Sequence, residues 1–446
     1  MNPEPQANKF EEQEENNMFL VYADGQGNVY DHPELYGLAR SGDMIVEIME
    51  DELIPLPEGA TLVGLPCTRA VGIDPESGEM QALPEGSQAV GALLPQGYTR
   101  LGLPGYVKTD KEYKLPLFGY TAVVWKDGGF FVAADPTDDP EKWDPIGCDR
   151  EQVKAGVGML TEKYPDNRLY QHLSHCALGY ECLTSSNTFL QRWEGGLPVS
   201  YSCNAGCFGC ISEQPDDSGF VSPQTRMNFR PRVDELVQVM LEHLKTPESI
   251  ISFGQGCEGE PSTQAKLIIE SIREVRSITD MGYININTNA GLSDHIRGIV
   301  DAGLDLMRVS TISALDDHYN AYYKPRGYTL ANVEKSLKYA VSQGVYTSIN
   351  YLVFPGVTDR EEEIEAMIEF ARRTGLRLIQ MRNLNIDPES YLGLIPPARG
   401  EILGMKQMLE IFRAELPDVV IGSYTHVPPA GMSRPKRPVS PSGARP

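Results

Sequence analysis

The second half of this 446-residue chain repeats one pattern, an apolar strand-like segment followed by an amphipathic helix-like segment. The strand-like segments are 197–203, 248–256, 283–289, 304–313, 346–356 and 377–385, and the helix-like segments are 232–244, 263–278, 292–303, 331–344, 359–375 and 400–416. Strands joined through a helix run parallel, with right-handed crossovers. Six such units predict an α/β chain with an open, partial (βα)6 TIM-like barrel, and a doubly wound sheet is the alternative architecture.

Residues 18–190 have a different texture, in which short apolar runs are broken by glycine and proline. Residues 18–32 and 121–136 are each typical of two strands around a turn, and Asp127-Gly128 marks the second turn. Helical periodicity is weak until about residues 149–164. The pattern predicts a mostly β accessory domain over residues 18–190, placed before the barrel.

The two ends of the chain are polar and poor in apolar residues. Residues 1–17 form an acidic lead and residues 428–446 a proline-rich basic tail, and we expect both to be disordered. The lead is neither a signal peptide nor a basic transit peptide, and no apolar run approaches the ~20 residues of a bilayer span. These features predict a cytoplasmic protein whose barrel domain occupies residues 195–427.

The charge of the chain is strongly negative and uneven. Asp and Glu number 62 against 39 Lys and Arg, which gives a formal net charge of -23. Residues 1–190 hold 31 acidic and 13 basic residues, a net charge of -18. Because like charges repel at long range, this balance argues against nucleic acid or an anionic membrane as a partner.

Three of the eight cysteines, Cys203, Cys207 and Cys210, follow the first expected strand with CxxxCxxC spacing. Clustered thiols in a chain without a secretory signal more often bind metal than form disulfides. Three thiolates can hold a [4Fe–4S] cluster and leave one iron open to a cofactor or substrate. Structural zinc is the alternative, although zinc sites usually pair two CxxC motifs and this sequence has no second one.

This motif, together with the strand–helix rhythm over residues 195–390, resembles the radical S-adenosylmethionine (SAM) superfamily. The resemblance implies that SAM chelates the open iron and that the reduced cluster cleaves SAM to a 5′-deoxyadenosyl radical, which abstracts a substrate hydrogen. It also implies a one-electron donor such as a flavodoxin or ferredoxin. One position departs from the family, which usually has an aromatic residue before the third cysteine where this chain has Gly209.

The ends of the later strands carry motifs that are similar to those of the same family. Glu258-Gly259-Glu260 resembles its loop over the SAM amino group, and Thr288-Asn289 resembles its Thr-Asn-Gly ending. Arg308-Val309-Ser310 is similar to the Arg-Val-Ser of the molybdenum-cofactor-synthesis branch. The match implies SAM contacts from Glu258, Gly259, Glu260, Thr288, Asn289 and Ser310. Without the family, each polar strand residue is more often a satisfied core polar group.

The sequence does not identify the substrate, but it offers candidate residues for binding it. Arg308, inside a strand, is the first candidate to grip a substrate carboxylate or phosphate, ahead of Arg382, Lys324 and Arg326. Cys257 is a candidate hydrogen-atom donor, and its alternative is a small buried hydrophobe. We expect either a peptide or protein substrate or a small cofactor precursor. The alternative for the whole chain is a non-catalytic iron–sulfur or zinc-binding scaffold.

The remaining cysteines raise one further hypothesis. Cys67, Cys148, Cys176 and Cys182 all precede the barrel motif and could hold an auxiliary iron–sulfur cluster. Their spacing matches no known ligand pattern, so the sequence leaves this cluster as a hypothesis.

Overall fold

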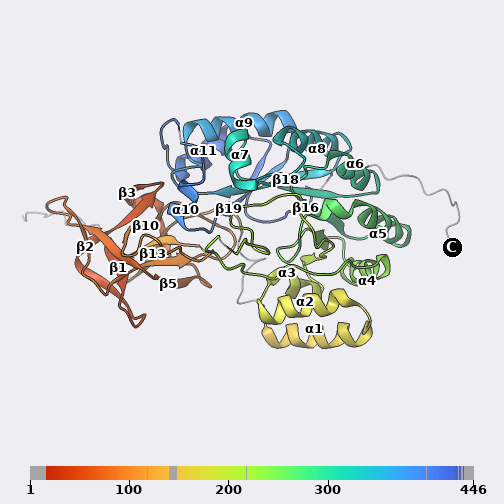
Figure 1. The fold of residues 1–446 in the computed structure, drawn as a ribbon, viewed down its shortest axis with the longest axis horizontal. Helices are drawn as coiled ribbons and strands as arrows, with labels where there is room; N and C mark the ends of the chain where they lie inside the picture. The colour runs from red at the N-terminus through yellow and green to blue at the C-terminus, as the bar shows by residue number, and fades with distance from the viewer. Residues whose placement is uncertain are drawn as a thin grey trace, which may run out of the picture.

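The computed structural model describes residues 17–117, 119–139, 148–216, 218–397, 399–429, 431–432 and 435. An antiparallel sheet forms one end of the molecule, and a curved parallel sheet surrounded by helices forms the other (Figure 1). The predicted acidic lead and basic tail lie almost entirely outside the described residues. Among the described helices, none has the length and hydropathy needed to cross a membrane.

The N-terminal sheet has 13 strands, and all of its pairings are antiparallel. Its main path runs β11-β6-β2-β1-β8-β12-β13-β4. The strands are β1 (Phe19–Ala23), β2 (Val29–Ser41), β3 (Met44–Glu47), β4 (Leu53–Pro55), β5 (Thr61–Leu65), β6 (Thr68–Ile73), β7 (Met80–Ala82), β8 (Gln88–Leu93), β9 (Tyr98–Arg100), β10 (Leu103–Pro104), β11 (Tyr106–Lys108), β12 (Thr121–Lys126) and β13 (Gly129–Pro136). Leu20 and Val21 belong to different apolar clusters, so both faces of β1 are buried.

Both predicted hairpins of this sheet are confirmed. β1 pairs with β2, and β12 pairs with β13. Asp127 and Gly128 form the two-residue turn of the second hairpin with φ of 51° and 78°. Two successive positive φ values suit a tight hairpin turn, because they match the twist of the flanking strands.

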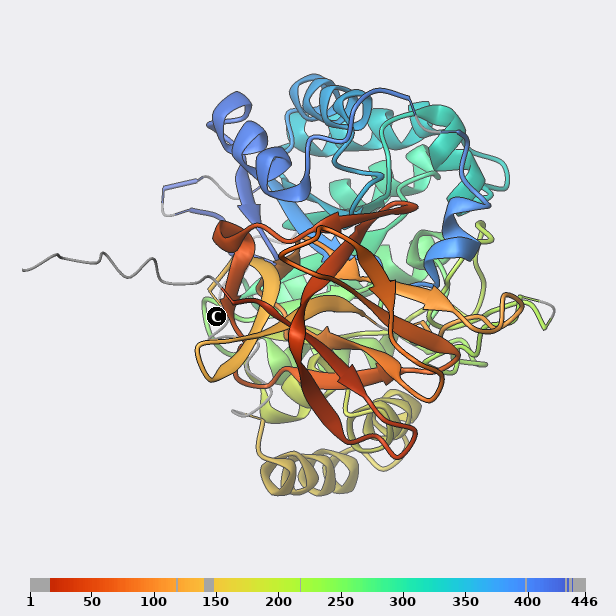
Figure 2. The ribbon, with the colours of Figure 1, turned by 90° about the vertical axis from the view of Figure 1, so that its left-hand side faces the viewer.

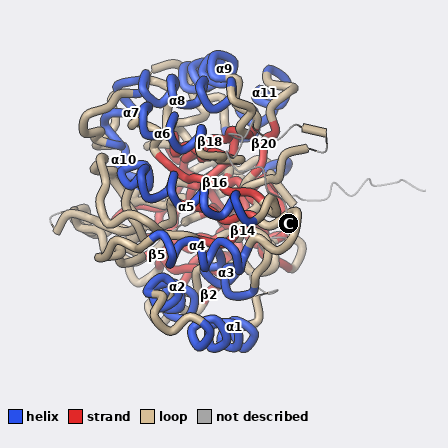
Figure 3. Tube along the Cα trace, turned by 90° about the vertical axis from the view of Figure 1, so that its right-hand side faces the viewer, coloured by secondary structure: helices blue, strands red, loops and turns tan. Residues whose placement is uncertain are grey.

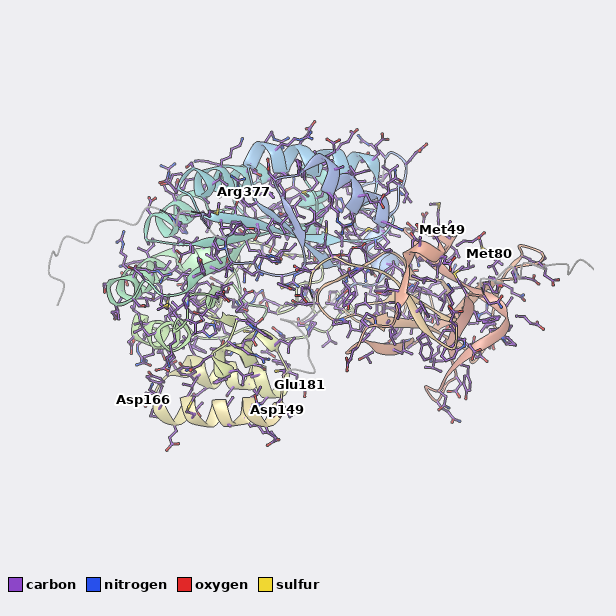
Figure 4. All side chains as sticks on the ribbon, turned by 180° about the vertical axis from the view of Figure 1, so that it is seen from behind. Met49, Met80, Asp149, Asp166, Glu181 and Arg377 are labelled. Carbon is purple, nitrogen blue, oxygen red and sulfur yellow. The ribbon has the colours of Figure 1, made fainter. Side chains whose placement is uncertain are left out.

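Three helices follow the sheet: α1 (Arg150–Lys163), α2 (Arg168–Gly179) and α3 (Leu183–Leu190). The side chain of Asp149 caps α1 by accepting a hydrogen bond from the Glu151 N–H at 2.9 Å. Figure 4 labels Asp149 and Glu181 at the end of this helical layer that points toward the β domain. The strands therefore end well before residue 190, the expected limit of the β region, although the division into domains itself stays a prediction.

The predicted partial barrel is confirmed as a seven-stranded parallel sheet in the order β14-β15-β16-β17-β18-β19-β20. Its helices cover the outer face of the sheet (Figure 3). The strands are β14 (Glu194–Gly196), β15 (Ile250–Phe253), β16 (Tyr283–Thr288), β17 (Leu306–Thr311), β18 (Tyr346–Val353), β19 (Leu378–Asn383) and β20 (Val420–Gly422). The helices are α4 (Val233–His243), α5 (Ala265–Ile278), α6 (Ser293–Asp301), α7 (Asp316–Tyr323), α8 (Leu330–Ser342), α9 (Glu361–Thr374), α10 (Pro388–Leu392) and α11 (Met405–Glu415).

The edge strands differ from the expectation. The strand expected over 197–203 does not form, and the edge strand is β14 (Glu194–Gly196), just before that range. The backbone amides that follow are bound by a side chain, since Val199 and Ser200 N–H donate to the Glu258 carboxylate, each at 2.8 Å. The seventh strand, β20, was not expected, since three residues are too short to show a period.

The β domain lies against the carboxyl ends of β18 and β19 and faces the viewer in Figure 2. The backbone N–H of Arg100 donates to Asn383 Oδ1 at 3.0 Å, and its fully buried guanidinium donates to the Leu384 carbonyl. Lys108 forms an ion pair with Asp387 at 2.6 Å. These contacts place the accessory domain over the edge of the barrel where active sites of this architecture collect.

Candidate active site

The CxxxCxxC loop leaves β14 and is fixed by backbone hydrogen bonds to the end of α7. Gly206 N–H donates to the Tyr323 carbonyl and Phe208 N–H to the Tyr322 carbonyl, both at 2.9 Å. Arg326 N–H donates to the Asn204 carbonyl at 2.8 Å. The loop is therefore held in one conformation at the carboxyl edge of the sheet, and its three cysteines are half-buried.

Gly209, the departure from the family pattern, has a backbone that explains its identity. Its φ is +79°, and an added Cβ would lie 3.0 Å from Ile386 Cδ1. An aromatic side chain there would be strained and short of space. The aromatic ring stands one position earlier, where Phe208 packs edge-to-face on Phe220 with centroids 5.4 Å apart.

Zinc and an iron–sulfur cubane place different requirements on three cysteine sulfurs. Two sulfurs bound to one zinc at about 2.3 Å each lie at most about 4.6 Å apart. Among the described residues, one group of three His, Cys, Asp or Glu has all its ligand atoms within 4.8 Å, and it is not the CxxxCxxC triad. A cubane does not require three sulfurs this close together, because its thiolates bind different irons.

The electrostatic environment of these thiols also fits a buried cationic group. Burial and then the carboxylate of Glu260 raise the pKa of Cys203. Burial and then the two neighbouring thiols raise the pKa of Cys207. A shared metal cluster stabilises such thiols as thiolates and so offsets the cost of ionising Cys203 and Cys207.

The loop after β15 is braced by Glu258. Its carboxylate accepts four backbone N–H groups at 2.8 Å, from Val199 and Ser200 beyond β14 and from Gly254 and Gln255 in its own loop. Burial raises the pKa of Glu258 to about 7, and the four amides oppose that shift. All the acceptor positions of this carboxylate face the protein, so its role in the structure is to join the two loops.

Gly259 and Glu260 continue this junction. Gly259 N–H donates to the Ser200 carbonyl at 2.7 Å, and an added Cβ on Gly259 would lie 2.1 Å from the Ser202 carbonyl oxygen. The Glu260 carboxylate accepts from the Thr288 hydroxyl and from Asn289 N–H, the latter at 2.8 Å. The strand-end motifs predicted from different βα units therefore meet through one carboxylate.

Asn289 connects this network to the cysteine loop. Its side-chain amide donates to Asn204 Oδ1 at 2.7 Å. Asn204 follows Cys203 directly, and its buried Nδ2 is one of the polar atoms of the described residues without a hydrogen-bond partner. A buried donor without a partner beside the cysteines fits a polar ligand at this place.

Arg308 lies inside the barrel rather than at its rim. Its guanidinium pairs with Glu194 at 3.1 Å and also donates to Gln380 and Thr425. Ser310, two residues further along β17, is half-buried and stands opposite Asn350 of β18. Asn350 Oδ1 is buried and has no partner among the described residues.

Arg382 of β19 adds a second guanidinium to this interior. Burial and then Arg308 lower the pKa of Arg382 to about 10, and Glu194 opposes that shift. No ion pair between described residues includes Arg382. Among the described residues, the guanidinium groups of Arg308 and Arg382 thus lie near the carboxylate of Glu194 in the barrel interior. Glu194 was missed from the sequence, because a lone glutamate in a Trp-Glu-Gly-Gly run carries no signal.

A cavity of about 630 Å³ opens beside the three cysteines. Four cationic side chains line it, Lys114, Arg226, Lys324 and Arg326, together with Glu213 and Asp216. Arg226 Nη2 lies 3.6 Å from Cys210 Sγ. Lys324 and Arg326 were expected near the barrel mouth, whereas Lys114 and Arg226 fall in stretches without a recognisable motif.

The other cysteines separate into different places. Cys257 is buried against Cys176 and His172, which form with it the group of ligand atoms within 4.8 Å. Cys67 lies in the β domain between β5 and β6, and Cys148 lies two residues before the start of α1. Cys67 is thus in a different part of the fold from Cys176 in α2 and Cys182 at the start of α3, and the auxiliary cluster stays a hypothesis.

Comparisons with known proteins agree with the motifs. Residues 197–371 match the sequence model of the Radical SAM superfamily. The GTP 3',8-cyclase of Staphylococcus saprophyticus is 26% identical over 179 residues, which cover 39% of this chain and 49% of that protein. The GTP 3',8-cyclase of Staphylococcus carnosus is 26% identical over 187 residues, 41% of this chain and 51% of that protein. The chain spans about half the length of these curated relatives.

Among solved structures, Streptococcus suis SuiB bound to S-adenosylmethionine is similar with a TM-score of 0.36 and 11% sequence identity. The likeness covers 58% of this chain and 55% of SuiB. A TM-score this low carries no weight for function.

Proposed function

We propose that this chain, whose residues 197–371 match the sequence model of the Radical SAM superfamily, is a radical SAM enzyme in which Cys203, Cys207 and Cys210 hold a [4Fe–4S] cluster. The observation that carries the proposal is the junction of strand-end motifs: Glu260 binds Thr288 and Asn289, and Asn289 binds Asn204 beside the first cysteine. Bound together, the cluster and SAM supply a reductive cleavage that yields a radical able to take a hydrogen atom from the substrate. A flavodoxin or ferredoxin is the expected electron donor.

In this proposal the protein residues position the ligands and exclude water. Glu258 and Gly259 join the loop after β15 to the cysteine loop, so that the two sides of the SAM site keep a fixed distance. Asn204 Nδ2 offers a donor to the polar end of SAM. Ser310 lines the same interior from β17. The β domain over the carboxyl ends of β18 and β19 limits solvent access from that side.

For the substrate, we propose a small anionic molecule. Arg308 and Arg382 face one carboxylate, Glu194, so the inner layer of the barrel has a surplus positive charge. A guanidinium group binds a carboxylate or phosphate in a planar, two-pronged geometry. The name GTP 3',8-cyclase, carried by the curated relatives, makes GTP the first candidate. A peptide or protein substrate is the second candidate, with the β domain as its recognition module.

The first experiment measures SAM cleavage. Anaerobically purified protein is mixed with SAM and a strong reductant, and 5′-deoxyadenosine is quantified by mass spectrometry. We expect about four iron atoms per chain and formation of 5′-deoxyadenosine. Cys203→Ser, Cys207→Ser and Cys210→Ser variants are expected to abolish both, while the matched control Cys67→Ser retains them. Stoichiometric zinc at these cysteines without SAM cleavage would instead support the scaffold alternative.

The second experiment concerns the substrate. GTP is added to the reduced enzyme, and 5′-deoxyadenosine formation is followed against GTP concentration. We expect Arg382→Gln to raise KM for GTP by about 10- to 100-fold, since a charged hydrogen bond contributes about 1.5–3 kcal/mol. Substrate-independent SAM cleavage should not change. The matched control is Arg372→Gln, at an exposed position of α9. Stimulation by peptides but not by GTP would favour the second candidate.

A further inference from the structure

A second cluster of metal-binding side chains lies outside the CxxxCxxC motif. His172 and Cys176 are four residues apart in α2, so they share one face of that helix. Cys257 comes from the loop after β15, between Gly256 and the bracing Glu258. The ligand atoms of these three residues all lie within 4.8 Å of one another, with Cys176 Sγ 3.9 Å from a ring nitrogen of His172.

The dimensions of this cluster suit a single ion. Two ligands of one zinc lie about 3.8 Å apart when zinc–sulfur bonds of about 2.3 Å meet at the tetrahedral angle. The thiolates of an iron–sulfur cubane bind different irons and lie further apart. Thiolates are soft ligands and imidazole is a borderline one. Among the common divalent cations, zinc is one that prefers such ligands.

The surroundings of the cluster bury both thiols and orient the imidazole. Cys176 and Cys257 are 1% and 3% exposed. His172 is half-buried, and its ring stacks edge-to-face on Phe229 with centroids 6.1 Å apart. The imidazole is thus oriented by packing and is partly exposed to solvent, which can supply a water as the fourth ligand.

We propose that His172, Cys176 and Cys257 bind one zinc ion. Binding displaces the thiol protons to solvent and changes no oxidation state. The ion joins α2 to the loop after β15, which contains Cys257. The residue after Cys257 is Glu258, whose carboxylate connects this loop to the segment that leads into the cysteine loop. Its consequence is a more rigid loop on one side of the proposed SAM site.

The test is metal analysis of anaerobically purified protein by mass spectrometry, with zinc and iron counted in the same sample. We expect one zinc per chain in addition to about four irons. Cys176→Ser and Cys257→Ser should lose the zinc and keep the iron, and His172→Gln should bind it more weakly. Cys67→Ser, in the β domain, should retain both metals. Cobalt(II) substituted for zinc should give thiolate-to-metal charge-transfer absorption that Cys176→Ser removes.

Three results would overturn the proposal. One is iron-loaded protein that cleaves SAM but holds no zinc, a result that leaves the proposed function intact. Another is about eight irons per chain with loss of half of them in Cys176→Ser, which would mean an auxiliary cluster. The third is a Cys176–Cys257 disulfide found by peptide mapping of protein prepared without air.

Discussion

Glu258 and Glu260 stand two residues apart in one loop, yet their carboxylates face different neighbours. Glu258 accepts four backbone amides, whereas Glu260 accepts from Thr288 and Asn289 at the end of the next strand. The resemblance implied that both would contact SAM. The contacts of Glu258 support a bracing role, and SAM contact by Glu260 and its neighbours stays a prediction.

Gly259 provides a test at the residue scale. The Cβ of Gly259→Ala would lie 2.1 Å from the Ser202 carbonyl oxygen, so the two loops must separate. We expect the Kd of SAM to rise at least about tenfold, or about 1.4 kcal/mol, with iron content unchanged. Calorimetric titration of cluster-loaded protein measures this. Gly158→Ala is the matched control, since nothing lies within 4 Å of its added Cβ in α1. Equal SAM affinity in both variants would contradict the assigned junction.

The site was only partly predictable from single residues. The cysteines and the strand-end motifs were recognisable because their spacing is fixed by one loop or one strand end. Glu194, Arg226 and Asn204 were not, because each becomes part of the site through contacts between distant segments. A polar residue's partner depends on tertiary packing, which local sequence does not encode.

At the scale of elements, one side chain links α2 to α4. Glu235 of α4 binds the Arg168 guanidinium through both oxygens, at 2.8 and 2.7 Å, and also accepts from Arg232 N–H. Burial alone would raise the pKa of Glu235, but the bonds from Arg168 and the backbone lower it to about 2. The linkage therefore stabilises the ionised carboxylate in the folded protein.

This pair predicts a pH dependence of stability. Because the folded pKa lies below the usual value of 4.5, the stabilisation is present above pH 4.5 and is lost as the pH falls toward 2. Glu235→Gln should lower the free energy of unfolding at pH 7 by about 2 kcal/mol. Below pH 4.5, the free energy of unfolding of this variant should fall less steeply with decreasing pH than that of the unchanged protein. Urea midpoints across this pH range measure it. Glu369→Gln, an exposed i,i+4 partner of Arg373, should change stability by less than about 0.5 kcal/mol. An unchanged acid slope in Glu235→Gln would be inconsistent with the assignment.

The elements that sequence predicted well are those with a long apolar period. Strands β15 to β19 lie within their expected ranges, since each is buried on the sheet and followed by an amphipathic helix. β14 and β20 have three residues each, and a short edge strand leaves almost no pattern. The helical pattern expected at about residues 149–164 corresponds to α1, whereas α3 was not expected, because most of its buried residues are serine, threonine and asparagine rather than apolar.

At the scale of the molecule, the β domain and the barrel share one buried surface. Arg100 is fully buried there and donates to Leu384 and Asn385. Gly42 N–H donates to the Pro355 carbonyl at 2.9 Å, and Gly42 and Gly356 approach so closely that neither admits a Cβ without a shift. No periodicity in the sequence predicts such an interface, because it joins residues that are hundreds of positions apart.

Arg100→Ala tests this arrangement. It leaves two buried acceptors unpaired and a cavity, so we expect the interface to weaken by about 2–4 kcal/mol. The radius of gyration from small-angle X-ray scattering should increase, and amides of β19 should exchange faster, with iron content unchanged. The control is Lys406→Ala, whose pair with Asp51 is largely exposed. An unchanged radius of gyration and unchanged exchange would argue that the domains are held by other contacts.

In the proposed function, three cysteines hold a cluster with one iron open to SAM. Electron paramagnetic resonance of the reduced, anaerobic protein, recorded before and after SAM is added, tests it most directly. We predict the signal of a reduced [4Fe–4S] cluster whose g values shift when SAM binds, and loss of that signal in Cys203→Ser, Cys207→Ser and Cys210→Ser. A reduced cluster whose spectrum is the same with and without SAM, or a protein that shows no cluster signal, would contradict the account.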